Sequence, residues 1–189
     1  MKRKLTIVSA VIIAAVLLSV GSFAFFTKEN TAKNVITAGN IDFVINEVTD
    51  SGEAFPVTPV EIMPGDTVSK IVTAKNTSDH PLYLRIKLTK TVDDPSLEVG
   101  DRLTADINDT DWTEKEGFYY YNKAVAPGEE TQPLFTEVYV DGITVGNEYL
   151  GKKFILKVDG YAVQSENNGT DVFTAAGWPE ENTAIVEEN

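Results

Sequence analysis

The sequence predicts an all-β protein, a jelly-roll-like β-sandwich of two antiparallel sheets. Apolar and polar residues alternate with a period of two over much of residues 35–163, whereas helical periodicity is scarce. Turn residues interrupt this pattern about every ten positions. A strand with one buried face produces such alternation, and short, regularly spaced strands are typical of sandwiches and jelly rolls.

The strongest strand prediction covers residues 82–89. Leucine and isoleucine occupy its even positions, and tyrosine, arginine, lysine and threonine occupy its odd positions, so that one face is apolar. Similar alternation, or β-branched and aromatic content, predicts further strands at 41–45, 68–74, 118–121, 135–140 and 154–158. Proline, glycine, asparagine and aspartate predict turns between them, at 63–66, 76–79, 126–129 and 141–142.

Two segments depart from the strand pattern, and a third ends the chain. Residues 93–111 are rich in aspartate and glutamate and are expected to form a long acidic loop across one end of the sandwich. Thr170 as an N-cap and Gly177 as a stop predict a short C-terminal helix. Residues 179–189 are expected to form an acidic tail.

The N-terminus has the features of a secretory signal. Basic residues at 2–4 precede an apolar run over residues 5–20, which is shorter than the roughly 20 residues that span a bilayer. Ser22 and Ala24 are small residues at the −3 and −1 positions, so cleavage is predicted between Ala24 and Phe25. The protein is therefore expected to be secreted, to the extracellular matrix or the cell surface.

The chain divides into four predicted parts: a signal peptide with a signal helix at 1–24, an N-terminal arm at 25–37, a jelly-roll domain at 38–178 and the acidic tail at 179–189. The alternative at the N-terminus is a retained membrane anchor, because Phe25 and Phe26 lengthen the apolar run if the peptidase does not cut.

Composition restricts the function classes. The net charge of −13 argues against nucleic acid as a partner, because the protein and the phosphate backbone repel each other. The chain has no cysteine, so packing and not disulfide bonds must stabilise the fold.

The sequence gives little support for enzymatic catalysis. A zinc peptidase of the common type needs two histidines one helical turn apart, and this chain has only His80, in a turn before a strand. It also lacks a Gly-x-Ser-x-Gly motif and a phosphate-binding loop. We therefore expect no catalytic residues, no enzyme activity and an exposed His80.

Two binding alternatives stay open. Asp106, Asn108, Asp109 and Asp111 are a weak calcium candidate, since the run lacks the glycine and glutamate that an EF-hand loop has at positions six and twelve. A solvated acidic loop without a cofactor is the other interpretation. Trp112 and the tyrosines at 119–121 suggest an aromatic platform for sugar, although alternate tyrosines of a strand must face the core.

Four pieces of sequence resemble one protein family. They are GSFAFFT at 21–27 with NVITAGNIDFVI at 34–45, MPGDT at 63–67 with AKNTS at 74–78, APGE at 126–129, and YAVQS at 161–165 with AAGWP at 175–179. Together they resemble the TasA and camelysin family of biofilm matrix proteins from spore-forming Gram-positive bacteria. The resemblance implies a jelly roll, extracellular fibres made of copies of the same chain, export through a SipW-type signal peptidase, and contact with other matrix components.

A physical route to such fibres starts at the arm. Phe25, Phe26 and Thr27, with Val35 and Ile36, are predicted to add as a donor strand to the sheet of the next subunit. Burial of each aromatic ring contributes about 1.5–3 kcal/mol, and an open contact of this kind builds a filament. The alternative is an arm that pairs within its own subunit or frays. Competing functions are a membrane-tethered surface adhesin, a carbohydrate-binding module and, least favoured, a camelysin-like metallopeptidase.

Overall fold

A computed structural model describes residues 35–37, 41–56, 60, 63–149 and 151–179, all within one compact unit that spans residues 33–187. This part of the chain is all-β, as predicted. Its helical content is two short 3-10 turns, η1 (Gly100–Arg102) and η2 (Asn147–Tyr149). The predicted signal helix, the cleavage site at Ala24 and Phe25, residues 25–34 of the arm and residues 180–189 of the tail lie outside the described residues.

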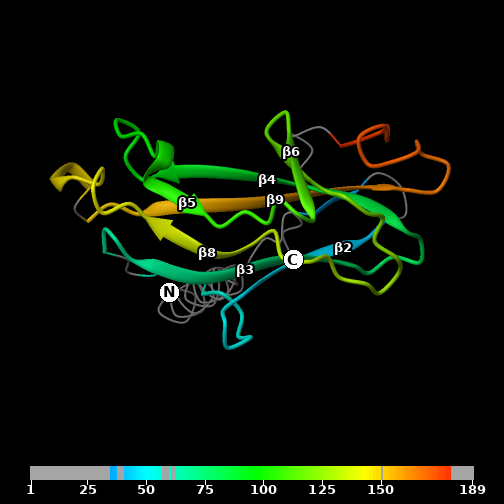
Figure 1. Ribbon diagram of the computed structural model, residues 1–189, viewed down its shortest axis with the longest axis horizontal. Helices are drawn as coiled ribbons and strands as arrows, with labels where there is room; N and C mark the ends of the chain where they lie inside the picture. Colours follow the sequence, from blue (N-terminus) through cyan, green and yellow to red (C-terminus); the bar gives the residue numbers. More distant parts are fainter. Residues whose placement is uncertain (1–34, 38–40, 57–59, 61–62, 150, 180–189) are drawn as a thin grey trace, which may run out of the picture. The chain divides into compact units, whose positions relative to one another are not determined.

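The strands form two sheets (Figure 1). The five-stranded sheet has the order β1 (Val35–Thr37), β9 (Phe154–Gln164), β4 (Leu82–Val92), β7 (Phe118–Tyr121) and β6 (Trp112–Lys115). The four-stranded sheet has the order β2 (Phe43–Val48), β3 (Thr67–Asn76), β8 (Phe135–Val140) and β5 (Leu103–Ala105).

All strand neighbours in the two sheets are antiparallel except one pair. β1 runs parallel to β9, a departure from the purely antiparallel sheets that the sequence predicts. A two-sheet sandwich is thus confirmed, whereas jelly-roll connectivity stays a prediction.

The main core lies between the sheets, as the alternation in β4 predicts. Leu82, Leu84 and Ile86 are fully buried in it. The odd positions of β4 face the outer side of the five-stranded sheet, where Tyr83 belongs to a second apolar cluster. β4 and β9 pair along their whole length, and this long ladder forms the centre of the sheet.

The two ends of the sandwich differ, and we name them after β9. At the Phe154 end, the turn at 63–66, the loop at 93–102 and the segment 141–153 meet: the amide of Gly65 bonds to the carbonyl of Val140, and the amide of Asp93 to that of Lys153. At the Gln164 end, the amide of Thr77 bonds to the carbonyl of Asp42, the amide of Leu82 to that of Val125, and the amide of Ser165 to that of Pro81.

The predicted helix at 170–177 is wrong. The segment is a series of turns in which side chains replace the helical ladder. Asp171 accepts from the amides of Phe173 and Thr174 through its carboxylate, and Asn168 bonds through its side chain to Gln164 and Ala176. Short polar side chains satisfy backbone groups locally in this way and compete with helix formation.

The predicted acidic loop at 93–111 is only partly correct. The segment crosses the Phe154 end, but it also contains η1 and β5, and β5 pairs with β8 from Leu103 to Ala105. Its apolar members Val99 and Leu103 are buried in the main core. Because many residues of this segment are charged, the sequence pattern did not predict that these two apolar residues are buried.

In the described part of the chain, no helix has the length and apolar character needed to cross a membrane.

Candidate functional site: the β9 edge and the outer face

The last three residues of the predicted arm are strand β1, at the edge of the five-stranded sheet. Val35 pairs with Gly160, Ile36 with Tyr161 and Thr37 with Ala162, all in parallel register. Of the predicted donor-strand residues, Val35 and Ile36 are therefore paired within their own subunit, as the alternative interpretation proposes. Phe25, Phe26 and Thr27 lie outside the described residues. We call the edge of β9 at Gly160–Ala162 the β1 seat.

Gly160 lets the two sheets approach each other closely beneath this seat. A Cβ atom on Gly160 would lie 2.7 Å from Cε2 of Phe43 and 2.8 Å from Cδ1 of Ile45, both on β2. Side-chain carbons do not approach this closely, so only glycine fits here without movement of the core. The β1 seat is thus next to a tightly packed seam between β9 and β2.

The outer face of the five-stranded sheet carries the second apolar cluster, which we call the outer-face cluster. Its buried members are Tyr83, Phe118, Tyr120, Tyr161, Val163 and Val172. Residues 165–179, the C-terminal strap, cover it with Val172 and the partly buried Ala175 and Trp178. The strap therefore completes a small core on a face that a simple sandwich exposes to solvent.

Arg85 lies at the centre of the outer-face cluster. Its guanidinium carbon is 3.8 Å from the centre of the Phe118 ring and 4.7 Å from that of Trp178. The same group donates to the hydroxyl of Tyr120 at 3.1 Å and to the carbonyl of Pro179 at 3.3 Å. A planar cation that stacks on aromatic rings and donates at its edges joins the sheet to the strap.

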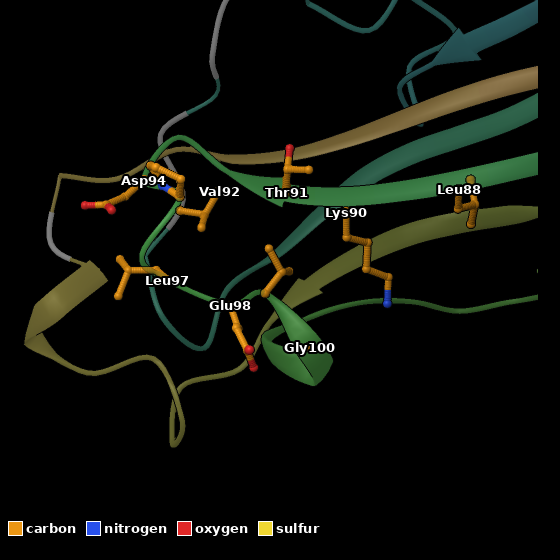
Figure 2. A pocket seen from close by; sticks show the side chains of 10 residues that line it. Leu88, Lys90, Thr91, Val92, Asp94, Leu97, Glu98 and Gly100 are labelled. Carbon is orange, nitrogen blue, oxygen red and sulfur yellow. The ribbon is translucent and has the colours of Figure 1, made fainter. Parts of the chain in front are cut away.

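An open hollow of about 710 Å³ lies at the Phe154 end (Figure 2). Leu88 and Val92 near the end of β4, together with Leu97 and Val99 of the following loop, supply its apolar lining. Beside it, the Nζ of Lys152 is 2.7 Å from the carboxylate of Asp94. This hydrogen bond holds the pKa of Asp94 well below its usual value and raises that of Lys152, so the pair ties the loop to the start of β9.

Three of the four calcium candidates use their side chains in hydrogen bonds of the protein itself. The carboxylate of Asp106 accepts from the amides of Thr136 and Glu137 and from the Thr136 hydroxyl, all on β8. Asn108 donates its amide to Asp111, which also lies 3.3 Å from Lys123. Asp109 is exposed. In the described ranges, no group of three or more histidine, cysteine or acidic residues is arranged to hold a metal ion.

His80 does not belong to a metal centre in the described structure. It is exposed, as expected, and its Nδ1 lies 3.7 Å from the carboxylate of Glu166 at the Gln164 end. Because it is the only histidine of the chain, the donor set of a common zinc peptidase is missing. The residues that the structure describes do not fit a catalytic zinc ion.

The aromatic platform for sugar is wrong. Trp112 is 1 % exposed and donates its indole N–H to the carbonyl of Gln132. Tyr119 and Tyr121 pack in or against the main core, whereas Tyr120 points to the outer-face cluster. The predicted alternation of these tyrosines is confirmed. Because Trp112, Tyr120 and Tyr121 are buried, these residues do not form the flat exposed platform that stacks on a sugar ring.

Sequence reasoning missed Gly160 and Arg85. A glycine inside an otherwise strand-like run signals close backbone approach, and Gly160 has this signature. Arg85 carried no comparable signal, because a cation on the polar face of an alternating strand is ordinary. Its role depends on Trp178 and Pro179, which are more than ninety positions away.

The chain matches a known protein family in the comparison with family models. The camelysin metallo-endopeptidase family matches residues 1–110, more than half of the chain. Comparison with curated proteins gave no match. The match covers the N-terminus, β1 to β5 and the first two of the four pieces of sequence that resemble this group, and it confirms the resemblance. The chain belongs to the camelysin metallo-endopeptidase family.

Proposed function

We propose that this protein is an exported structural protein that assembles into extracellular matrix fibres when its N-terminal arm leaves the β1 seat and pairs with a neighbouring copy. The observation that carries the proposal is the β1 seat itself. There β9 accepts a strand at its edge, and the present occupant is the end of the predicted donor arm.

The pairing within the subunit is weak enough to be exchanged. β1 pairs over only three residues, at the edge of a sheet and in the parallel orientation, which is slightly less stable per residue than the antiparallel one. The other edge of β9 pairs with β4 over eleven residues. Exchange of the arm therefore removes only the edge strand of the sheet and leaves the long central ladder between β4 and β9 intact.

The full arm can form a longer ladder with a neighbouring subunit than the three residue pairs that β1 forms within its own subunit. The full arm, residues 25–37, extends over about 43 Å, comparable with the roughly 36 Å length of an eleven-residue strand. A longer ladder and burial of Phe25 and Phe26, at about 1.5–3 kcal/mol for each ring, favour the intermolecular arrangement.

Export is part of the proposal. A SipW-type signal peptidase cuts between Ala24 and Phe25 and frees the arm, and N-terminal sequencing of the secreted form tests this step. A first residue of Phe25 supports it. Retention of residues 1–24 would point instead to a membrane-tethered surface protein.

A truncation tests the assembly role. Residues 25–189 are expected to form filaments visible by electron microscopy, and residues 38–189 are expected to form none. Because the truncation also removes β1, a synthetic peptide of residues 25–37 serves as the control: it should bind the truncated domain and restore its thermal stability. Filaments from the truncated domain would refute strand donation.

We also propose that the protein is not a peptidase, despite the name of its family. The surroundings of His80 support this, because the single imidazole has one carboxylate beside it and no second histidine exists in the chain. Casein cleavage with and without a chelator is the test. Cleavage that a chelator abolishes, and that copurifies with the mature chain, would overturn it.

A further inference from the structure

The direction of β1 limits how copies of this chain can be joined. Because β1 is parallel to β9, its Thr37 end points to the Gln164 end of the sandwich. The chain continues to Ile41 and Asp42, and the bond from the Thr77 amide to the Asp42 carbonyl places Asp42 at that same end. Only three residues, 38–40, separate Thr37 from Ile41. Four residue steps span at most about 14 Å, so the arm stays within that distance of the Gln164 end of its own domain.

This short connection makes parallel exchange incompatible with a head-to-tail filament. An arm placed in the β1 seat of a neighbour in the same register has its Thr37 end at the neighbour's Gln164 end. The Gln164 ends of both copies then face each other. Since both arms leave from these ends, the two copies exchange arms reciprocally, and such a contact is isologous and closes as a dimer.

A head-to-tail filament places the Gln164 end of the donor against the Phe154 end of the recipient. The C-terminal end of the arm, Thr37, then lies at the Phe154 end of the recipient, and the N-terminal end of the arm lies toward the recipient's Gln164 end. In this arrangement the arm is antiparallel to β9. β9 already has an antiparallel partner, β4, along its other edge. Antiparallel pairing is also slightly more stable per residue than the parallel pairing that β1 makes.

We propose that the arm reverses its orientation when it assembles: it is parallel to β9 within the single subunit and antiparallel to the β9 of the next subunit in the filament. This inference rests on the proposed function. It means that β1 cannot slide from one subunit to the next and must detach completely from its seat. The pairing within the subunit thus holds the single chain in a form that does not polymerise.

Cysteine cross-linking tests the orientation, because the natural chain has no cysteine. Copies with Thr27→Cys in the arm are mixed with copies carrying one cysteine at either end of β9, Ile155→Cys or Glu166→Cys. Ile155 and Glu166 are both exposed. Thr27 lies ten residues before Thr37, which is about 33 Å along an extended strand. The antiparallel arm therefore brings Thr27 near Glu166 and far from Ile155.

The expected result is several-fold more intermolecular disulfide in filaments of the Thr27 and Glu166 variants than in filaments of the Thr27 and Ile155 variants. The opposite ratio in filaments would overturn the reversal and leave strand donation intact. Discrete dimers linked through Thr27 and Ile155, without filaments, would overturn both. If the mature chain without added cysteines does not assemble at all, the proposed function and this inference are both overturned.

Discussion

The guanidinium of Arg85 stacks on the ring of Phe118, 3.8 Å from its centre, on the outer face of the five-stranded sheet. The same cation reaches Trp178 of the C-terminal strap at 4.7 Å and donates to the carbonyl of Pro179. One side chain of β4 therefore connects β7 to a segment that has no ladder of its own with the sheet.

Replacement of Arg85 is expected to release the strap. Arg85→Ala should lower the free energy of unfolding by about 1–3 kcal/mol, because it removes the cation–π contacts and two hydrogen bonds. The chain has two tryptophans, and Trp112 is fully buried. A red shift in the tryptophan emission of Arg85→Ala is therefore expected, because release of the strap exposes Trp178 to water.

Arg85→Lys is the matched control, because it keeps the charge and loses the planar group. We expect it to restore only part of the stability. A wild-type emission spectrum for Arg85→Ala would show that the strap is held without this residue.

Gly160→Ala tests the close contact between β9 and β2. The new methyl group meets Phe43 and Ile45 at less than 3 Å, and overpacking of this kind costs about 1–3 kcal/mol. Urea unfolding of the variant should show a lower midpoint.

The double variant Gly160→Ala with Ile45→Val removes Cδ1, one of the two clashing atoms. It should be less destabilised than the sum of the two single variants. Additive effects would mean that the two side chains do not meet.

Acid is expected to weaken the contact between the segment after β5 and strand β8. Partial burial opposes ionisation of Asp106, but hydrogen bonds from the Thr136 hydroxyl and from the amides of Glu137 and Thr136 lower its pKa. The pKa of an aspartate in the unfolded chain is about 3.9. The stabilisation is therefore complete above that pH and is lost as the pH falls through the lower folded value.

Asp106→Asn should be less stable than the wild type at pH 7 and should lose less stability between pH 5 and pH 3. Urea titrations at each pH measure both effects, and Asp109→Asn, a neighbouring exposed aspartate, controls for the change in net charge. An equal loss of stability in the wild type and in Asp106→Asn would contradict the assignment.

Salt is expected to accelerate assembly, because each copy carries a charge of −13 before processing. Screening shortens the range of repulsion from about 30 Å at 0.01 M salt to about 10 Å at 0.1 M. Light scattering of the mature chain should therefore show a shorter lag at the higher salt concentration. The domain of residues 38–189 should not assemble at either concentration, and a lag independent of salt would argue against charge repulsion as the barrier.

Local pattern was sufficient to predict the body of the fold. Even residues of β4 are buried because leucine and isoleucine alternate there with polar groups. The consecutive tyrosines of β7 divide between the two faces because successive side chains of a strand point to opposite sides. The turns predicted at 63–66 and 126–129 are also present in the structure. Such features depend on neighbours in the sequence.

Features that depend on distant partners were missed or misread. The pairing of Ile36 with Tyr161 joins positions 125 residues apart, and no local pattern reports a parallel edge strand. The cap-like Thr170 suggested a helix, but the side chains of Asn168 and Asp171 satisfy the backbone there. Trp112 resembled a binding aromatic, but its ring packs 5.0 Å from that of Tyr121 and its indole N–H donates to the carbonyl of Gln132. The local sequence pattern does not report these contacts.

Release of β1 from its seat is the central step of the account, and a reversible lock tests it most directly. Thr37→Cys with Ala162→Cys places the only two cysteines of the chain on paired positions of β1 and β9. The oxidised protein, with the cross-link verified by mass spectrometry, should stay monomeric under the electron microscope, and reduction should restore filaments. Filaments from the fully cross-linked monomer at the rate of the reduced protein would contradict the account.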